Sequence, residues 1–159
     1  MFLNGQRQSI RTSLYSTPPT CLDLTLFLPE TQENPQVLAY LRDVKNVLEL
    51  RTLTTGALEL TFPLDVGTVG GFSGRRIDSE IFYKFTSFLV PGTIYRCDLS
   101  QAAVQPTVFR DTIVSGFDAA LFQTKQVFVS SKDGTKFPMF IVAPKDLVLD
   151  GSNPALLYG

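Results

Sequence analysis

Two pairs of carboxylates have the spacing that comes closest to an acid–base site in this sequence. Glu30 and Glu33 form one pair, and Asp78 and Glu80 form the other. Neighbouring carboxylates can serve as general acid and general base. Both pairs lie in stretches predicted to be polar turns, where acidic side chains are usually solvated surface groups. We therefore assign no catalytic role to either pair.

The sequence contains no histidine, which excludes several kinds of site. A Ser-His-Asp or Cys-His nucleophile needs an imidazole to accept the proton, and zinc sites built on histidine need one as a ligand. The two cysteines, Cys21 and Cys97, are too few and too far apart for a cysteine metal site. A disulfide between them is possible, but one pair makes no disulfide framework, so we expect two free thiols. The sequence predicts no catalytic, cofactor-binding or metal-binding residue.

Other short motifs have structural interpretations. The glycines at 67, 70, 71 and 74 do not fit GxGxxG, and no Gly-Lys-Ser/Thr follows them. We interpret these glycines as positions at which closely packed strands leave no room for a side chain. Arg75-Arg76 is too small for a nucleic-acid patch. Lys132 and Asp133 are expected to be turn residues.

Composition narrows the class of protein. The 159 residues carry 14 Lys+Arg and 15 Asp+Glu, and 44% of them are hydrophobic, which suits one domain or parts of two. Balanced charge argues against a nucleic-acid binder. The apolar run LDLTLFLP is short and contains Asp23, so it cannot span a bilayer, and no targeting signal is convincing. We expect a cytoplasmic protein without nucleic-acid or membrane partners.

The elements that would position any site are predicted to be strands. Residues 1–36 are interrupted by prolines and are expected to be irregular, whereas residues 37–114 show short apolar runs of period two separated by turns. This indicates antiparallel β structure. The repeat length is close to that of a propeller blade, although a β-sandwich would give the same rhythm. The runs are VLAYL, NVLELRTL, ALELTFPL, VGTVGGFSG, EIFYKFTSF, TIYRCDL and TVFRDTIV, with LVPG expected to turn at Pro91-Gly92.

The character of the sequence changes near Ser115. KQVFVSS and KFPMFIVAP predict a hairpin, with a type I′ turn at Asp133-Gly134. The loop LVLDGSNP and the apolar run PALLYG follow. A continuous apolar run is typical of a strand buried on both faces of a parallel sheet. Residues 115–159 are therefore expected to open a second domain.

Several long strings resemble the prolyl oligopeptidase (prolyl endopeptidase) family of serine peptidases. They are DVKNVLELRTLTTGALELTFPL, DSEIFYKFTSFLVPGTIYRCDL, QPTVFRD and SSKDGTKFPMFIVAPKDLVLDGSNPALLYG. The resemblance implies a mainly β chain: the last blades of a seven-bladed β-propeller over 37–114, then the first strands of an α/β-hydrolase domain over 115–159. It also implies a complete enzyme that hydrolyses short peptides after proline and needs no cofactor. Residues 1–36 match poorly, as if a strand had been lost between Pro35 and Val37.

The chain lacks the catalytic motifs of that family. The family's nucleophilic serine lies in a GxSxG-type elbow and is followed by the triad Asp and His, and none of these motifs occurs here. The family's oxyanion-hole tyrosine belongs to a Tyr-Gly-Gly-Phe stretch that begins just after the residue matching Gly159, so Tyr158 is not that residue. We expect a fragment without peptidase activity of its own. A non-catalytic β-rich module that binds a peptide or protein, including a regulatory short form, is the alternative.

Overall fold

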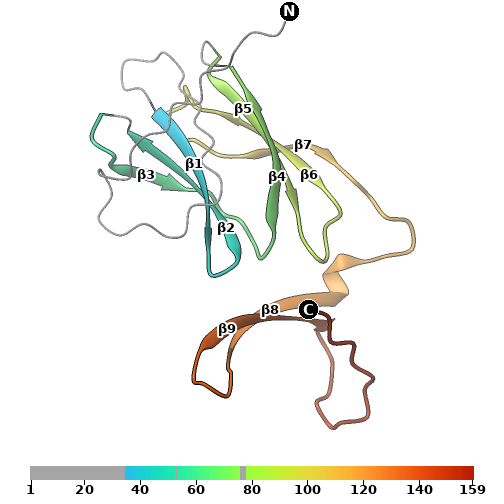
Figure 1. Ribbon diagram of the computed structural model, residues 1–159. Helices are drawn as coiled ribbons and strands as arrows, with labels where there is room; N and C mark the ends of the chain where they lie inside the picture. Colours follow the sequence, from blue (N-terminus) through green and yellow to red (C-terminus); the bar gives the residue numbers. More distant parts are fainter. Residues whose placement is uncertain (1–34, 53, 76–77) are drawn as a thin grey trace, which may run out of the picture.

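The chain is mainly β. The computed structural model describes residues 35–52, 54–75 and 78–159, which contain no α-helix and one short 3-10 helix. Figure 1 shows two sheets above a separate hairpin. The strands are β1 (Pro35–Arg42), β2 (Lys45–Thr52), β3 (Leu58–Thr61), β4 (Thr68–Gly74), β5 (Glu80–Thr86), β6 (Thr93–Asp98), β7 (Thr107–Asp111), β8 (Phe122–Ser130) and β9 (Lys136–Pro144).

The first sheet has the order β1-β2-β3, with antiparallel neighbours. Val37 lies opposite Leu50 and Ala39 lies opposite Leu48, so these apolar side chains share one face. Glu49 and Arg51 project from the other face because side chains alternate along a strand. The pattern of NVLELRTL therefore predicted the strand and placed Leu48 and Leu50 on the core face, whereas Val47 lies on the face of Glu49.

The second sheet is an antiparallel meander with the order β4-β5-β6-β7. A four-stranded antiparallel sheet of this kind is the unit from which propeller blades are built. Gly-rich β4 pairs with β5, and the register shifts between Val69 and Gly71. The short polar connection before β5 agrees with the predicted turn, of which residues 76 and 77 lie outside the described part of the chain.

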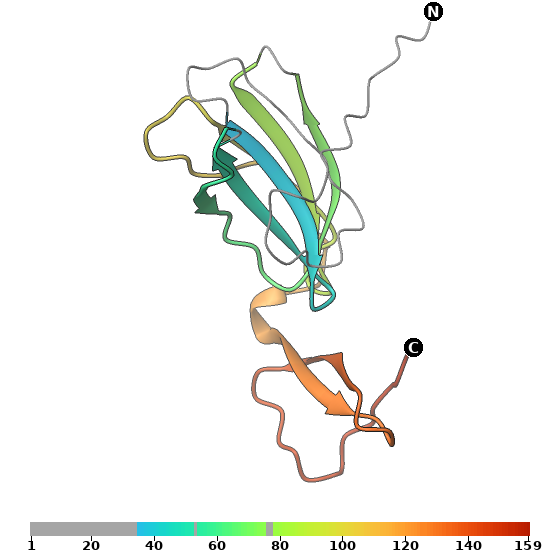
Figure 2. The ribbon, with the colours of Figure 1, turned by 60° about the vertical axis from the view of Figure 1, so that its left-hand side comes forward.

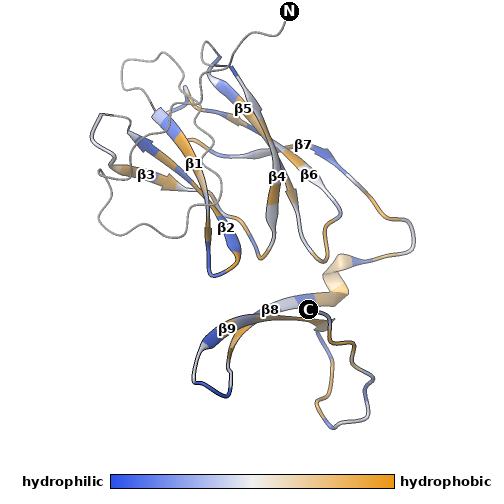
Figure 3. Ribbon diagram, in the orientation of Figure 1, coloured by the Kyte–Doolittle hydropathy of each residue, from blue (hydrophilic) through white to orange (hydrophobic). Residues whose placement is uncertain are grey.

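The core lies between the two sheets, which run side by side in Figures 1 and 2. Hydrophobic and hydrophilic positions alternate along several of their strands (Figure 3), and each sheet turns one apolar face toward the other. Tyr83 of β5 packs edge-on against Phe62 at 6.0 Å and stacks on Tyr95 at 5.1 Å between ring centroids. The buried cluster comprises Val37, Leu48, Leu50, Phe62, Ile81, Tyr83, Phe85, Cys97 and Leu99.

Cys97 lies in this core as a free, buried thiol. The sequence predicted a free thiol here but not its burial. Burial raises the pKa of Cys97 to about 11. The other cysteine, Cys21, lies outside the described residues.

Strands β8 and β9 form a hairpin by themselves, in continuous register from Phe122–Pro144 to Ser130–Lys136. The hairpin follows the 3-10 helix η2 (Ala119–Leu121) and lies beyond the ends of the two sheets (Figures 1 and 2). Residues 112–118, which join it to β7, are exposed. The change of character predicted near Ser115 therefore coincides with the passage from the sheets to the hairpin.

The predicted type I′ turn at Asp133-Gly134 is wrong. Residues 131–135 form a longer loop in which Gly134 has a φ of 85° and Asp133 is not left-handed, whereas a type I′ turn needs both central residues left-handed. The Asp133 carboxylate instead accepts hydrogen bonds from the Ser131 hydroxyl and the Thr135 amide. Two left-handed residues do occur between β1 and β2, at Asp43 (φ 52°) and Val44 (φ 62°).

Three further expectations differ from the structure. Strand β1 begins at Pro35, two residues before Val37, where the strand-like pattern was predicted to start. The turn after β5 is closed by Ser87, whose amide donates to the Val90 carbonyl, and not by Pro91-Gly92. The strand predicted for PALLYG is absent: 154–159 are exposed and have no strand partner in the described structure. A strand needs a hydrogen-bonded neighbour, which an apolar pattern alone does not supply.

Candidate functional site

The carboxylates Asp78 and Glu80 do not form an acid–base pair. The Arg75 Nε donates to Asp78 Oδ2 at 2.8 Å, and the Arg96 guanidinium forms an ion pair with Glu80. The hydrogen bond to Asp78 raises the pKa of Arg75, and that to Glu80 raises the pKa of Arg96. Each carboxylate is therefore paired with an arginine and not with the other carboxylate.

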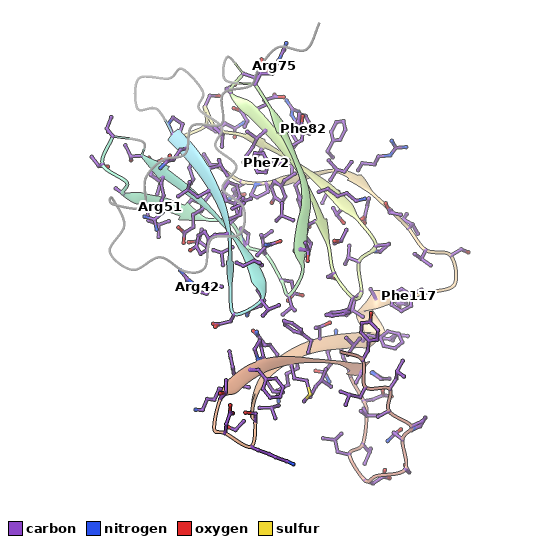
Figure 4. All side chains as sticks on the ribbon, viewed as in Figure 1. Arg42, Arg51, Phe72, Arg75, Phe82 and Phe117 are labelled. Atoms are coloured by element: carbon purple, nitrogen blue, oxygen red, sulfur yellow. The ribbon has the colours of Figure 1, made fainter. Side chains whose placement is uncertain are left out.

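Both ion pairs border an open hollow of about 630 Å³ at one end of the second sheet. Figure 4 shows Arg75 and Phe82 at this end. The hollow offers charges of both signs and two serine hydroxyls. A serine nucleophile needs a base to take its proton, and the chain has no histidine to serve as one. The lining residues are Ser73, Gly74, Arg75, Asp78, Ser79, Glu80 and Phe82.

A second polar cluster lies on the first sheet, on the face opposite the core. Glu49 is 3% exposed and accepts a hydrogen bond from the Tyr40 hydroxyl. The Arg51 Nε donates to Glu49 Oε2 at 2.8 Å, and its Nη1 donates to the Gly56 carbonyl at 2.8 Å. Arg42 donates to the Tyr40 oxygen at 2.8 Å and lies over its ring. Figure 4 labels Arg42 and Arg51 on this sheet.

The β1–β2 hairpin brings these side chains together. The two-residue turn at Asp43-Val44 sets Leu38 opposite Glu49 and Tyr40 opposite Val47, so Tyr40 and Glu49 are diagonal neighbours on one face. Sequence reasoning missed the cluster, because charged residues that alternate with leucines are ordinarily interpreted as solvent-facing. A signal was present: a short turn between two alternating runs fixes which polar residues meet across the hairpin.

The arrangement of this cluster suits a structural role and not a catalytic one. Burial, with the hydrogen bond to Glu49, raises the pKa of Tyr40 to about 12, so the phenol keeps its proton at neutral pH. Glu49 is held between the Tyr40 hydroxyl and the Arg51 guanidinium. The Tyr40 phenol is therefore not poised to move a proton near pH 7. The network therefore positions the two strands rather than acting on a substrate.

The glycines also have structural roles, and these differ from one position to another. A Cβ at Gly67 would overlap the Thr86 carbonyl oxygen and the Phe85 ring, which agrees with close packing. Gly70 has open space around it, and a Cβ at Gly71 would meet only Lys84 Cβ at 4.0 Å. Close packing therefore explains Gly67 but not its neighbours.

The remaining residues singled out from the sequence form no site. Lys132 and Asp133 lie in the exposed loop between β8 and β9, where the Ser131 hydroxyl and the Thr135 amide hold the pKa of Asp133 at about 2. Tyr158 is 94% exposed. The predictions for Glu30, Glu33 and Arg76 lie outside the described residues, and within them no group of His, Cys, Asp or Glu could hold a metal ion. No helix in the described part is long and apolar enough to cross a membrane.

Comparison with known proteins gives a consistent result. A family described as prolyl oligopeptidase, N-terminal beta-propeller domain, matches residues 29–110. The chain is 42% identical over 125 residues to prolyl oligopeptidase ophP of Omphalotus olearius, which covers 77% of this chain and 16% of that protein. It is 36% identical over 124 residues to the dual function macrocyclase-peptidase POPB of Amanita bisporigera, which covers 77% of this chain and 17% of that protein.

A solved structure shares the arrangement of strands as well. Prolyl oligopeptidase B from Galerina marginata, in its apo form, superposes with a TM-score of 0.67 at 32% identity, over 84% of this chain and 19% of that one. The same protein has been solved with a 35mer hydrolysis and macrocyclization substrate, and that structure superposes with a TM-score of 0.66. The chain thus spans less than a fifth of the length of these relatives.

Proposed function

Because the chain belongs to the prolyl oligopeptidase family, we propose that it is part of a serine endopeptidase that hydrolyses short peptides after proline. The observation that carries this proposal is the family match over residues 29–110. The two face-packed antiparallel sheets over the same stretch support it, since they have the form of neighbouring propeller blades. In the proposed enzyme the blades restrict access to short, proline-containing peptides.

The proposed division of the chain follows the sequence. Residues 1–36 precede the blades, residues 37–114 are the last blades of a seven-bladed propeller, and residues 115–159 begin the α/β-hydrolase domain. The separate β8–β9 hairpin and the exposed segment before it support a boundary near Ser115. The free, buried thiol of Cys97 supports the proposed cytoplasmic location, because structural disulfides are rare there.

The chain on its own is proposed to be inactive, because it lacks the groups that form an acyl-enzyme. It contains neither a histidine to act as base nor a GxSxG-type nucleophile elbow. Loss of triad members typically lowers kcat by about 10⁴- to 10⁶-fold. The blades and the hairpin would then contribute shape and access, and the reacting groups would come from other parts of the enzyme.

Turnover of a fluorogenic Gly-Pro peptide tests this proposal. We expect the purified 159-residue chain to release no more fluorophore than a mock-purified control, while a complete prolyl oligopeptidase under the same conditions turns the peptide over. Because some relatives are named macrocyclase-peptidases, cyclic products should be sought as well. Turnover that co-purifies with the chain would contradict the proposal. Saturable binding of the peptide without turnover would favour the non-catalytic binding module.

A further inference from the structure

Two Asp-Gly pairs lie in exposed loops in the described part of the chain. Asp133-Gly134 lies between β8 and β9, and Asp150-Gly151 lies between β9 and the C-terminal run PALLYG. Because glycine has no Cβ, nothing on the glycine itself shields its backbone nitrogen from the side chain of the preceding aspartate. These two pairs are therefore the places where an aspartate side chain can react most readily with its own backbone.

The two pairs are closely alike in local geometry. Their glycines have φ values of 85° and 84°, and a Cβ at either glycine would have open space around it. Each aspartate accepts a hydrogen bond at Oδ1 from the amide two residues later, that of Thr135 at 3.0 Å and that of Ser152 at 2.9 Å. A serine hydroxyl also donates to each carboxylate, from Ser131 in one loop and from Ser152 in the other. Exposure, backbone conformation and carboxylate partners therefore do not distinguish the two sites.

The hydrogen bonds of the glycine amides do distinguish them. The Gly134 amide donates to the Ser131 carbonyl at 3.0 Å, and the Ser131 amide donates to the Thr135 carbonyl at 2.9 Å, next to the last pair of the hairpin ladder. The Gly151 amide has no acceptor among the described residues. Within that part of the chain, no amide after Leu147 donates to a backbone carbonyl. A segment without such bonds changes conformation at little cost in free energy.

The reaction open to such a pair is the formation of a succinimide. The Gly151 nitrogen attacks Cγ of the Asp150 carboxylic acid, a C–N bond forms, and the acid OH leaves as water with the amide proton. A water molecule then opens the ring. Addition of that water at Cγ restores aspartate, whereas addition at the main-chain carbonyl of Asp150 breaks its bond to nitrogen and leaves an isoaspartate. The atoms balance with water alone, and no oxidant or reductant takes part.

A hydrogen bond from the attacking amide opposes this reaction. The nitrogen must give up its proton and turn its lone pair toward Cγ, so the bond from Gly134 to Ser131 has to break before Asp133 can react. The net stabilisation by one hydrogen bond corresponds to about a 2- to 10-fold difference in the reactive population. Asp150 has no such bond to lose.

We propose that Asp150-Gly151 is a site of spontaneous backbone isomerisation through a succinimide, and that the loop between β8 and β9 protects Asp133-Gly134 from the same reaction. The isoaspartate adds a methylene group to the main chain between β9 and residues 154–159, so it changes the path of the chain toward that apolar run. The site follows from contacts within this chain and does not depend on the proposed peptidase activity.

Incubation in oxygen-18 water tests the proposal in the 159-residue chain, because each succinimide that hydrolyses retains a labelled oxygen. After digestion in ordinary water, mass spectrometry measures label and isoaspartate in the peptide that carries each Asp-Gly pair. We expect about 2- to 10-fold more label at Asp150 than at Asp133 in native buffer. In guanidinium chloride, which removes the loop hydrogen bonds, the two sites should take up label equally.

Matched glycine variants locate the reaction. Gly151→Ala should suppress the label at Asp150 and leave the label at Asp133 unchanged, whereas Gly134→Ala should leave the label at Asp150 unchanged. The proposal is overturned if both sites take up label alike in native buffer, or if no isoaspartate forms at Asp150. It is also overturned if the excess at Asp150 persists in guanidinium chloride, because the local sequence and not the loop structure would then set the rate.

Discussion

Glu49 is a charged side chain that the first sheet buries almost completely. Its two oxygens accept hydrogen bonds from the Tyr40 hydroxyl and from the Arg51 guanidinium. A buried carboxylate with both oxygens bonded is tolerated, but removing one member of a buried ion pair is costly. Breaking the cluster should therefore lower the free energy of unfolding by more than the intact cluster adds to it.

Replacing Glu49 by Gln should lower the free energy of unfolding by about 2 kcal/mol. Breaking a fully buried pair costs about 3–5 kcal/mol, and the 22% exposure of the Arg51 side chain reduces that figure. Denaturant unfolding at pH 7 measures the loss. Glu59→Gln is the matched control, because Glu59 is exposed on neighbouring β3 and its replacement should cost less than about 0.5 kcal/mol. Equal losses for the two variants would show that the cluster adds nothing.

Alkaline pH should destabilise the chain through buried groups whose pKa is raised, among them Cys97 and Tyr40. Burial raises the pKa of Cys97 from 9.0 to about 11, and burial with the Glu49 hydrogen bond raises that of Tyr40 from 10.0 to about 12. The folded chain then holds both protons more tightly than the unfolded chain does. Stability is complete below pH 9 and falls as the pH rises through 11 and 12.

Unfolding curves between pH 8 and pH 12 check the alkaline effect. Cys97→Ala removes one of these groups, so the stability of the variant should fall less steeply between pH 9 and pH 11 than that of the unsubstituted chain. Because the cavity left by the substitution lowers stability at every pH, the slope is compared and not the absolute value. Parallel curves for the two chains would show that the Cys97 thiol is not responsible.

Among the elements, most strands could be predicted from the sequence, whereas the conformations of several turns could not. Period-two runs such as NVLELRTL determine which residues face the core, because a shift of one residue would expose all of them. Turn types depend on φ values that the sequence signals only weakly. Asp133-Gly134 has the preferred dipeptide but a longer loop, while Asp43-Val44 is left-handed without a glycine. PALLYG has the apolar pattern of a strand but no hydrogen-bonded neighbour in the described structure, and a local sequence pattern cannot show whether such a neighbour exists.

The polar contacts, like the turns, could be predicted from the sequence only in part. The lack of histidine is a property of composition, so a histidine-dependent catalytic site could be excluded from the sequence alone. The Tyr40–Glu49 contact depends on the register of the β1–β2 hairpin, and the hydrogen bond from Gln126 to the Asp43 carbonyl joins residues 83 positions apart. Contacts between elements that are distant in sequence arise from packing, and a single sequence contains no direct signal for them.

Gly67→Ala and Gly70→Ala should differ sharply although the two glycines lie on the same stretch of chain. A methyl group at Gly67 would overlap backbone at Thr86, so we expect a loss of about 1–3 kcal/mol. At Gly70 the space is open, and the loss should stay below about 0.5 kcal/mol. Thermal unfolding of the two variants side by side measures the difference. A similar loss at both positions would contradict the close approach of β4 and β5 at Gly67.

At the level of the whole molecule, the two sheets and the hairpin differ in how much apolar surface they expose. The sheets bury a shared core that includes Tyr83 and Leu48. The hairpin and the residues after it expose large apolar side chains, among them Phe128 (54%) and Leu156 (95%). Apolar surface of this extent is normally covered by other parts of a protein or by a partner. The proposed hydrolase domain would supply that cover, since the matched relatives are several times longer than this chain.

Sequencing independent transcripts that contain the codons for residues 37–159 tests the central proposal most directly. If these residues join the last propeller blades to the start of a serine peptidase, the same reading frame should encode further blades upstream. After the codon for Gly159 it should encode Tyr-Gly-Gly-Phe or a close variant, then a GxSxG-type motif, then the triad Asp and His in that order. Independent transcripts that all carry a stop codon directly after Gly159, with no hydrolase exons downstream, would contradict the proposed peptidase and favour a non-catalytic protein.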